Sequence, residues 1–332
     1  MKGGINTKKS DLDNVFTQVT QSALAERLEL DFAAVPVQSD LESMKASVSG
    51  AEVIISTWGA LPYTPDILDV CPELKLVLYG AGSFKSYVTP ELVFAGVTVC
   101  SAVHLNAQPV AEFTLGIILT SLKNVIEHSR KIHETGRNGW EKPSPYNGGY
   151  YRTRVGLLGF GEISRILLKL LGNFEFEVFI ADDFMSAEDA AAFGAKKAAV
   201  EEIMADCDVV SIHHADVEKN WNIINKRTLA MMKPGARIIN TSRGRMINEP
   251  DLVEKLREGT ISAYLDVTHP EPPKDGHPFY ELDNCILTPH VAGSLGTEVH
   301  RMGDYCLREL DNWIAGKPLE NQIDITALEN RA

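Results

Sequence analysis

Residues 155–164 read Val155-Gly156-Leu157-Leu158-Gly159-Phe160-Gly161-Glu162-Ile163-Ser164, and this segment is typical of a strand, a glycine turn and a helix in succession. The apolar half predicts a buried strand, and the two glycines predict a tight turn into a helix. In such a turn the first glycine permits the bend and the second lets the backbone approach a pyrophosphate. The phosphates then lie on free N–H groups at a helix start. Because a glycine pattern alone is a weak signal, the interpretation depends on the rest of the chain.

Strands and helices alternate on both sides of this turn. Short apolar runs predict six strands in the second half, at residues 155–158, 177–181, 209–213, 237–240, 263–267 and 285–287. In the first half, residues 51–56 and 74–79 predict two further strands, and a short helix beginning at Pro65 lies between them. The alternation predicts an α/β protein with parallel sheets, the second of them a doubly wound dinucleotide-binding domain.

Four further segments complete the expected organisation. A first strand is expected before a helix at residues 11–28, but residues 2–9 are polar and contain glycine, so this strand is either short or missing. Residues 110–125 predict a helix buried on more than one face, and residues 137–152 predict a long loop. A long helix is expected from Gly296 to about Gly316.

Composition limits the function. The chain has 332 residues, enough for two domains that each bury a core, and a formal net charge of -13. This excess of acid disfavours a nucleic-acid surface and an anionic-membrane patch. The five cysteines are dispersed without metal-type spacing, and no apolar run has the length of a signal peptide or a membrane span. We therefore expect a cytoplasmic protein that binds no metal, nucleic acid or membrane.

Acidic residues after the second strand of this domain predict the cofactor. Asp182 lies where an acid accepts hydrogen bonds from the adenosine ribose, and Asp183 adds charge that would repel a 2′-phosphate. These residues favour NAD over NADP, the alternative being a surface turn that happens to carry two acids. Glu162 would lie near the pyrophosphate, and we interpret it as a first-turn acid that interacts with the helix dipole. His213 and His214 end the strand 209–213, where one of them is expected to border the cofactor.

Three residues after predicted strands supply the chemistry that reduction of a 2-keto acid requires. Arg243 follows strand 237–240 and offers a permanent planar cation to a carboxylate or a ketone oxygen. His290 follows strand 285–287 and can exchange the proton, while a carboxylate such as Glu271 next to it favours the protonated ring. Each alone has an ordinary explanation as a turn, a loop dipeptide or a helix cap. Their combination in one domain is difficult to explain by chance.

Several sequence blocks together resemble the D-isomer-specific 2-hydroxyacid dehydrogenase family, from about Ala51 onward. The blocks are Val110-Ala111-Glu112, Gly159-Phe160-Gly161, Met232-Lys233-Pro234-Gly235-Ala236, Asn240-Thr241-Ser242-Arg243-Gly244, Leu265-Asp266-Val267, Glu271-Pro272 and Thr288-Pro289-His290. Three places depart from the family pattern: Ser164 replaces a third glycine, His214-Ala215-Asp216 stands where a proline-containing segment is usual, and Ser83-Phe84-Lys85-Ser86-Tyr87 lacks the usual aspartates.

The resemblance implies a Rossmann domain at 104–294 inserted into a flavodoxin-like substrate domain formed by 1–103 and 295–332. It implies that Arg243 binds substrate, that His290 exchanges the proton and that Glu271 supports His290. The backbone N–H groups of Gly80-Ala81-Gly82 would hold the substrate carboxylate, with Trp58 and Tyr79 nearby. The expected cofactor contacts are Gly159, Phe160, Gly161, Glu162, Ile163, Asp182, His213, His214, Ala215, Thr241, Ser242, Asp266 and Gly293. Family members are commonly homodimers, with the segment after Val110 at the interface.

The expected function is hydride transfer between NAD(H) and C2 of a small 2-hydroxy or 2-keto acid. Relatives that oxidise formate carry glutamine in place of Glu271, and phosphoglycerate-type relatives carry basic residues where this chain offers Trp58, Tyr79 and Phe84. A small or apolar, non-phosphorylated acid is therefore expected. The alternative is an NAD(H)-sensing regulatory protein that uses the same fold and turns over negligibly.

Overall fold

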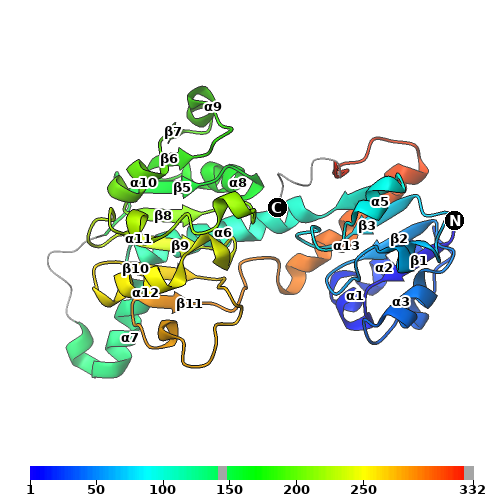
Figure 1. The fold of residues 1–332 in the computed structure, drawn as a ribbon, viewed down its shortest axis with the longest axis horizontal. Coiled ribbons are helices and arrows are strands. Elements are labelled where there is room, and N and C mark those ends of the chain that lie inside the picture. The colour runs from blue at the N-terminus through cyan, green and yellow to red at the C-terminus, as the bar shows by residue number, and fades with distance from the viewer. Residues whose placement is uncertain (141–147, 325–332) are drawn as a thin grey trace. The chain divides into compact units, whose positions relative to one another are not determined.

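The structure, a computed structural model, describes residues 1–140 and 148–324 of the chain (Figure 1). The chain divides into two units. Unit 1 comprises Met1–Pro109 and Gly293–Ala332, and unit 2 comprises Val110–Ala292. Each unit has its own sheet, and helix α6 (Val103–Ser121) contains the first crossing between them. Of the predicted loop 137–152, residues 137–140 belong to the 3-10 helix η2 (Gly136–Trp140), and 141–147 lie outside the described residues.

The other helices and strands of unit 1 are β1 (Gly3–Asn6), α1 (Lys9–Val15), α2 (Gln18–Ala25), α3 (Leu41–Val48), β2 (Val53–Ser56), α4 (Pro65–Leu68), β3 (Leu76–Tyr79), α5 (Pro90–Phe94), β4 (Thr98–Ser101) and α13 (His300–Ile314). Those of unit 2 are α7 (Val125–Thr135), β5 (Arg154–Leu158), α8 (Glu162–Leu171), β6 (Glu177–Ala181), α9 (Ala187–Ala192), β7 (Ala195–Lys197), α10 (Val200–Asp206), β8 (Val209–Ile212), α11 (Lys226–Leu229), β9 (Arg237–Asn240), α12 (Glu249–Arg257), β10 (Ser262–Leu265) and β11 (Cys285–Leu287).

The sheet of unit 1 is parallel, with its strands in the order β1-β2-β3-β4. Outside β1, Lys2 forms a parallel bridge with Glu29, which follows α2 in the chain. The chain therefore first steps outward from β1 and then returns to place β2 on its other side. This reversal is the doubly wound arrangement of the flavodoxin-like domain that the family resemblance implies for this unit.

The first strand is short rather than missing, and its glycines have a packing reason. All four residues of β1 are buried, and a Cβ on Gly4 would lie 2.9 Å from the Cα of Val48 in α3. A side chain there would push α3 off the sheet. The helix expected at 11–28 is divided into α1 and α2, because the Thr17 side chain accepts a hydrogen bond from the Thr20 N–H and caps a new helix.

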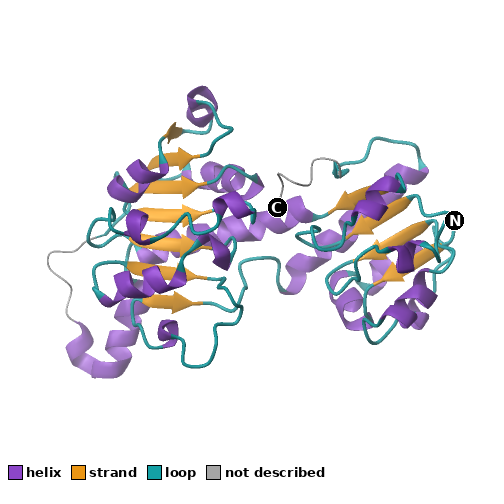
Figure 2. Ribbon diagram, in the orientation of Figure 1, coloured by secondary structure: helices purple, strands orange, loops and turns teal. Residues whose placement is uncertain are grey.

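The sheet of unit 2 has seven parallel strands in the order β11-β10-β9-β8-β5-β6-β7, and Figure 2 shows helices on both of its faces. The strand order reverses between β5 and β8. The crevice beyond the carboxyl ends of strands at such a reversal is where open α/β sheets bind ligands. Six of these strands were predicted. The edge strand β7 was missed because it consists of Ala195 and two exposed lysines.

Close packing around β5 explains a further glycine. A Cβ on Gly156 would lie 2.3 Å from Cγ2 of Ile203, so α10 packs directly on the strand. The buried residues of α6 recur every three or four positions and so form one face of the helix, whereas Glu112 and Gly116 are exposed, so the expectation of burial on more than one face is wrong. The buried residues of this face are Ala107, Val110, Ala111, Thr114, Ile118 and Ser121. This helix ends at Ser121, earlier than predicted. No single helix among the described residues is long and apolar enough to cross a membrane, although α6 and residues 125–140 pass by length and composition as a pair bent by 55°.

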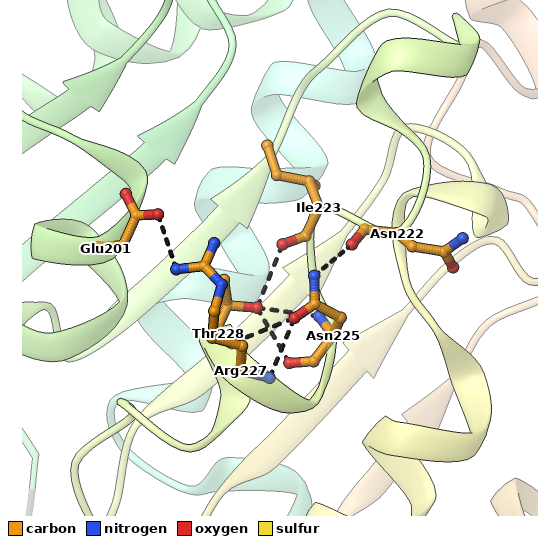
Figure 3. A network of polar contacts seen from close by, with 6 residues as sticks. All are labelled: Glu201, Asn222, Ile223, Asn225, Arg227 and Thr228. Atoms are coloured by element: carbon orange, nitrogen blue, oxygen red, sulfur yellow. Dashed lines mark hydrogen bonds and ion pairs between the residues drawn. The ribbon is translucent and has the colours of Figure 1, made fainter.

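A polar network orders the chain between β8 and β9 (Figure 3). The Asn225 side chain accepts a hydrogen bond from the Arg227 N–H, 3.0 Å away, and so caps α11. The Arg227 guanidinium in turn donates to Glu201 of α10 at 2.9 Å. The network ties the segment that follows His213 and His214 to the body of unit 2.

Candidate functional site

Most of the residues predicted to act in chemistry or cofactor binding lie at the carboxyl ends of the strands in unit 2. Gly159 follows β5, Asp182 follows β6, His213 follows β8, Arg243 follows β9, Asp266 follows β10 and His290 follows β11. In a parallel sheet these ends form one edge, so residues up to 131 positions apart in the sequence lie along the same edge.

The glycine turn has the shape of a phosphate cradle. Gly159 has φ +101°, and a Cβ on it would lie 2.8 Å from the His214 nitrogen, so only glycine fits. Nothing lies within 4 Å of the Cβ position on Gly161, which leaves open space at the start of α8. Ser164, in place of the third glycine, is buried and donates its hydroxyl to the Gly159 carbonyl at 2.6 Å. Ser164, which stands where the family pattern has glycine, therefore stabilises the turn.

Asp182 joins the two loops beside this cradle. Its carboxylate accepts hydrogen bonds from the N–H groups of Phe160 and Phe184, each at 2.9 Å. Each oxygen keeps a further lone pair, so the expected contact with ribose hydroxyls remains a prediction. Glu162 lies exposed in the first turn of α8, as interpreted from the sequence, and Ile163 follows it there.

His213 and His214 follow β8 on the other side of the cradle. His213 is buried, its Nε2 lies 2.9 Å from the Ser211 hydroxyl, and burial lowers its pKa to about 3. The ring is therefore neutral near pH 7 and does not serve as a proton donor. Within the described part of the chain, His213 Nδ1 and His214 Nε2 are buried without a hydrogen-bond partner. Such atoms are costly unless a ligand pairs with them, which fits a bound cofactor.

The turn that carries Arg243 is held by the side chain of Asn240. Its amide donates to the Arg243 carbonyl at 2.9 Å, and its Oδ1 accepts the Ser242 N–H at 3.1 Å. The hydroxyl of Thr241 lies 3.0 Å from that of Thr114 in α6. The guanidinium of Arg243 donates one N–H to the Ser242 carbonyl at 2.6 Å, which leaves several donors for an anion.

His290 and Glu271 form the pair that the sequence predicts. His290 Nδ1 lies 2.6 Å from Glu271 Oε1, and the two side chains are 46% and 41% exposed. Because an ionised carboxylate only accepts hydrogen bonds, Nδ1 is the donor and Nε2 is left for another molecule. The backbone of His290 has φ +54°, an unusual conformation for a residue other than glycine.

Asp266 holds the loop that carries His290, a role that the sequence analysis missed. Its Oδ1 accepts from the Thr288 hydroxyl at 2.5 Å and the Val291 N–H at 2.8 Å, and its Oδ2 accepts from the Ala292 N–H at 2.9 Å. Asp266 is 3% exposed. A lone pair on Oδ2 remains for the expected contact with the cofactor.

Replacing Asp266 by asparagine is expected to loosen this loop. Asparagine has one acceptor oxygen, and its NH₂ group would face a backbone donor. We expect the free energy of unfolding to fall by about 2 kcal/mol, since hydrogen bonds to charged groups contribute roughly 1.5–3 kcal/mol. The melting temperature of a unit of this size should fall by roughly 4–8 °C, as measured by calorimetry. Asp283→Asn, at a side chain that is 93% exposed, is the matched control and should leave it unchanged.

The Arg243 loop and the Glu271 loop are in backbone contact. A Cβ on Gly244 would lie 2.0 Å from the carbonyl carbon of Thr268. The chain after Thr268 is itself fixed, because the His269 N–H donates to the buried Glu249 carboxylate at 2.7 Å. Burial raises the pKa of Glu249. Gly244 therefore sets how closely the turn bearing Arg243 approaches the loop that leads to Glu271.

In unit 1 the predicted glycine loop follows β3, and the structure corrects part of its assignment. The Gly80 N–H is donated to the Ser56 carbonyl at 2.8 Å and is not available to a substrate. Among the described residues no acceptor is recorded for the N–H groups of Ala81 and Gly82, which remain as donors. Tyr79 is 2% exposed, and its hydroxyl donates to the Ser83 carbonyl, so it supports the loop from the core and does not line a substrate site.

Two other predicted residues also lie in unit 1. Trp58 is partly buried and packs against the hydrophobic core. Gly293 begins the second segment of the unit, where a Cβ would lie 3.2 Å from Oδ1 of Asn106. This close approach gives a reason for glycine at that position, while its contact with a cofactor stays a prediction.

Comparison with known proteins gives a consistent result. Residues 115–292 match the model for the NAD-binding domain of the D-isomer-specific 2-hydroxyacid dehydrogenases. Glyoxylate reductase from Thermofilum pendens is 31% identical over 251 residues, which cover 74% of this chain and 73% of that protein. D-3-phosphoglycerate dehydrogenase from Mycobacterium leprae is 25% identical over 93% of this chain, which spans 57% of that longer protein.

The fold is shared with solved structures at lower identity. D-mandelate dehydrogenase from Rhodotorula graminis superposes with a TM-score of 0.82 at 20% identity, over 97% of each chain.

Proposed function

This chain belongs to the D-isomer-specific 2-hydroxyacid dehydrogenase family, and from that premise we propose that it reduces a small, non-phosphorylated 2-keto acid with NADH. The family's reaction is nicotinamide-linked hydride transfer on 2-hydroxy and 2-keto acids, and the chain is an oxidoreductase of this class. The observation that carries the proposal is the 2.6 Å pair between His290 and Glu271 at the sheet edge that also bears Arg243.

The residues of the edge have distinct roles in the proposed reaction. When bound, the nicotinamide supplies the hydride that C2 receives. His290 donates a proton from Nε2 to the ketone oxygen, because Nδ1 is held by Glu271, and the carboxylate stabilises the protonated ring. Arg243 binds the substrate carboxylate or the ketone oxygen with its free donors. We further propose that the N–H groups of Ala81 and Gly82 bind the substrate carboxylate.

Residues after the cradle support a nicotinamide dinucleotide and favour NAD. The open space at Gly161, the fixed Asp182 carboxylate and the two unpaired imidazole nitrogens fit the pyrophosphate and the adenosine. Asp183 is exposed and places a second negative charge beside Asp182, which opposes a 2′-phosphate.

The N-terminal unit favours a substrate without phosphate. Its glycine loop, Gly80-Ala81-Gly82, carries no cation that could bind a phosphate. The segment 83–87 contributes one cation, Lys85, which already has an interaction.

We also propose that the protein is a homodimer that uses α7. This helix has no buried residue, and it leaves Val125 48% exposed, while Trp140 after it is 73% exposed. Contact with a second copy of the chain would remove these apolar side chains from water. Light scattering of the purified chain measures the state directly, and a monomer would contradict the proposal.

The test of the proposed activity is NADH oxidation followed at 340 nm with a panel of 2-keto acids. The panel should include glyoxylate, hydroxypyruvate, a branched-chain keto acid and phosphohydroxypyruvate. We expect turnover with at least one of the first three and a lower kcat/KM with the phosphorylated acid. Phosphohydroxypyruvate as the best substrate would contradict the substrate proposal. Tight NADH binding without turnover on the whole panel would favour the NAD(H)-sensing protein.

A further inference from the structure

Four charged or titratable side chains gather where β6 and β8 end. Asp182 and Asp183 follow β6, while His214 and Lys219 follow β8, Lys219 within the 3-10 helix η3 (Glu218–Asn220). Lys219 Nζ lies 3.9 Å from Asp183 Oδ2 and 4.7 Å from the centre of the Phe184 ring. Two acids thus face two bases at the end of the site where the adenosine is expected.

The side chain of His214 is the least satisfied of the four. Its Nε2 is buried and has no hydrogen-bond partner among the described residues. Its backbone nitrogen lies against the glycine turn, 2.8 Å from the Cβ position of Gly159. A polar atom in this state, next to a ligand cradle, is suited to pair with a group of the ligand.

The charge on His214 depends on its surroundings. Burial lowers its pKa from the usual value, Asp182 and Asp183 oppose this shift, and Lys219 adds to it. The adjacent His213 stays neutral near pH 7 because burial lowers its pKa to about 3. At neutral pH the four side chains therefore carry two negative charges and one positive charge. In acid, protonation of His214 brings the local charge to zero.

We propose that His214 is a specificity-determining residue whose protonation opens the adenosine end of the site to the 2′-phosphate of NADP. The inference rests on the proposed binding of a nicotinamide dinucleotide at this edge. NADP differs from NAD only by a dianionic group on the ribose whose hydroxyls Asp182 is expected to bind. With His214 neutral, the two carboxylates repel that group. With His214 protonated, the imidazolium and the Lys219 ammonium balance them.

The sign of the pH dependence follows from linkage. If the phosphate binds better to the protonated ring, bound NADP must raise the pKa of His214. Binding of NADP is then accompanied by proton uptake at His214, and binding of NAD is not. The ratio Kd(NADP⁺)/Kd(NAD⁺) should therefore fall as the pH falls. One additional positive charge beside the phosphate changes this ratio of dissociation constants by roughly tenfold.

The experiment is isothermal titration calorimetry of the full chain with NAD⁺ and NADP⁺, which are stable in acid, between pH 5.5 and 8.5. In the unaltered protein the Kd ratio should fall by about tenfold across this range. His214→Gln keeps a polar side chain without a titratable ring and should remove most of this change. Lys219→Gln is the matched control, which should raise the ratio at every pH and keep its pH-dependent fall, shifted toward higher pH because Lys219 lowers the pKa of His214. The part of the slope that remains in His214→Gln measures ionisation of the phosphate itself.

Two outcomes overturn the inference. The first is an equal slope in the unaltered protein and in His214→Gln. The second, which needs no variant, is equal proton uptake for NAD⁺ and NADP⁺ when the unaltered protein is titrated in two buffers of different ionisation enthalpy. If the unaltered protein binds both dinucleotides and either outcome is found, only the role of His214 is refuted. Failure of the unaltered protein to bind either dinucleotide refutes the proposed function and this inference together.

Discussion

Replacement of His290 by glutamine is expected to lower kcat by about 10²- to 10⁴-fold, the usual contribution of general acid–base catalysis. Glutamine can still donate a hydrogen bond to Glu271 but cannot deliver a proton to the ketone oxygen. The affinity for NADH should change little, since the glycine turn at Gly159 and Gly161 follows a different strand, β5. Steady-state kinetics with the preferred keto acid and a fluorescence titration of NADH measure both effects.

The backbone at this position calls for a second variant. His290 has φ +54°, a conformation that asparagine adopts more readily than glutamine does. His290→Asn therefore separates loss of the proton donor from backbone strain, and its kcat should fall as much as that of His290→Gln. Glu271→Gln should lower kcat by less than either His290 variant does, because it removes the charge and keeps a hydrogen-bond acceptor. A His290→Asn variant that retains most of its activity would rule out His290 as the proton donor.

The larger features of the fold were predictable because the strands are continuous buried runs. Segments 155–158 and 237–240, for example, are buried in the sheet. The segments predicted from the sequence overlap the observed strands β5 and β9. The placement of Arg243 and His290 followed from the same pattern, since each comes directly after a buried strand. Parallel strands bring such residues to one edge regardless of their distance in the sequence.

The misses have a different physical origin: they depend on contacts between distant residues. Gly4 weakens the strand signal of residues 3–6, and only the position of α3 explains it. Edge strand β7 carries two exposed lysines, so it lacks the apolar pattern on which strand prediction relies. Tyr79 was expected near the substrate from the family resemblance, yet its ring is buried in the core and its hydroxyl donates to the Ser83 carbonyl.

The support of the candidate site could not be predicted for the same reason. The bonds from Thr288, Val291 and Ala292 to Asp266 span more than 20 residues. The sequence identified Asp266 by its block and assigned it only to the cofactor. A buried carboxylate with three donors is a constraint on loop geometry that becomes visible only in three dimensions.

Replacement of Gly244 by alanine is expected to destabilise unit 2 and to disable the site in one step. The added Cβ would lie 2.0 Å from the Thr268 carbonyl carbon and 2.2 Å from its oxygen. Both are backbone atoms and cannot rotate away, so one of the two loops must move. Overpacking of this kind costs about 1–3 kcal/mol and occasionally more. A shift of roughly 1 Å between catalytic groups costs about 10²-fold in rate, so kcat/KM should fall by at least that factor.

Calorimetry and steady-state kinetics on the same preparation test both parts of this expectation. Gly172→Ala is the matched control, because Gly172 has φ -60° and a Cβ there would meet nothing closer than 3.4 Å. That variant should keep the melting temperature and the activity of the unaltered protein. If the lost activity comes from displacement of Arg243, the KM for the keto acid should rise in Gly244→Ala while the Kd for NADH stays within a fewfold. A Gly244→Ala protein with unchanged stability and kinetics would mean that the loops bearing Arg243 and Glu271 are not in backbone contact, and the proposed geometry of the site would have to be abandoned.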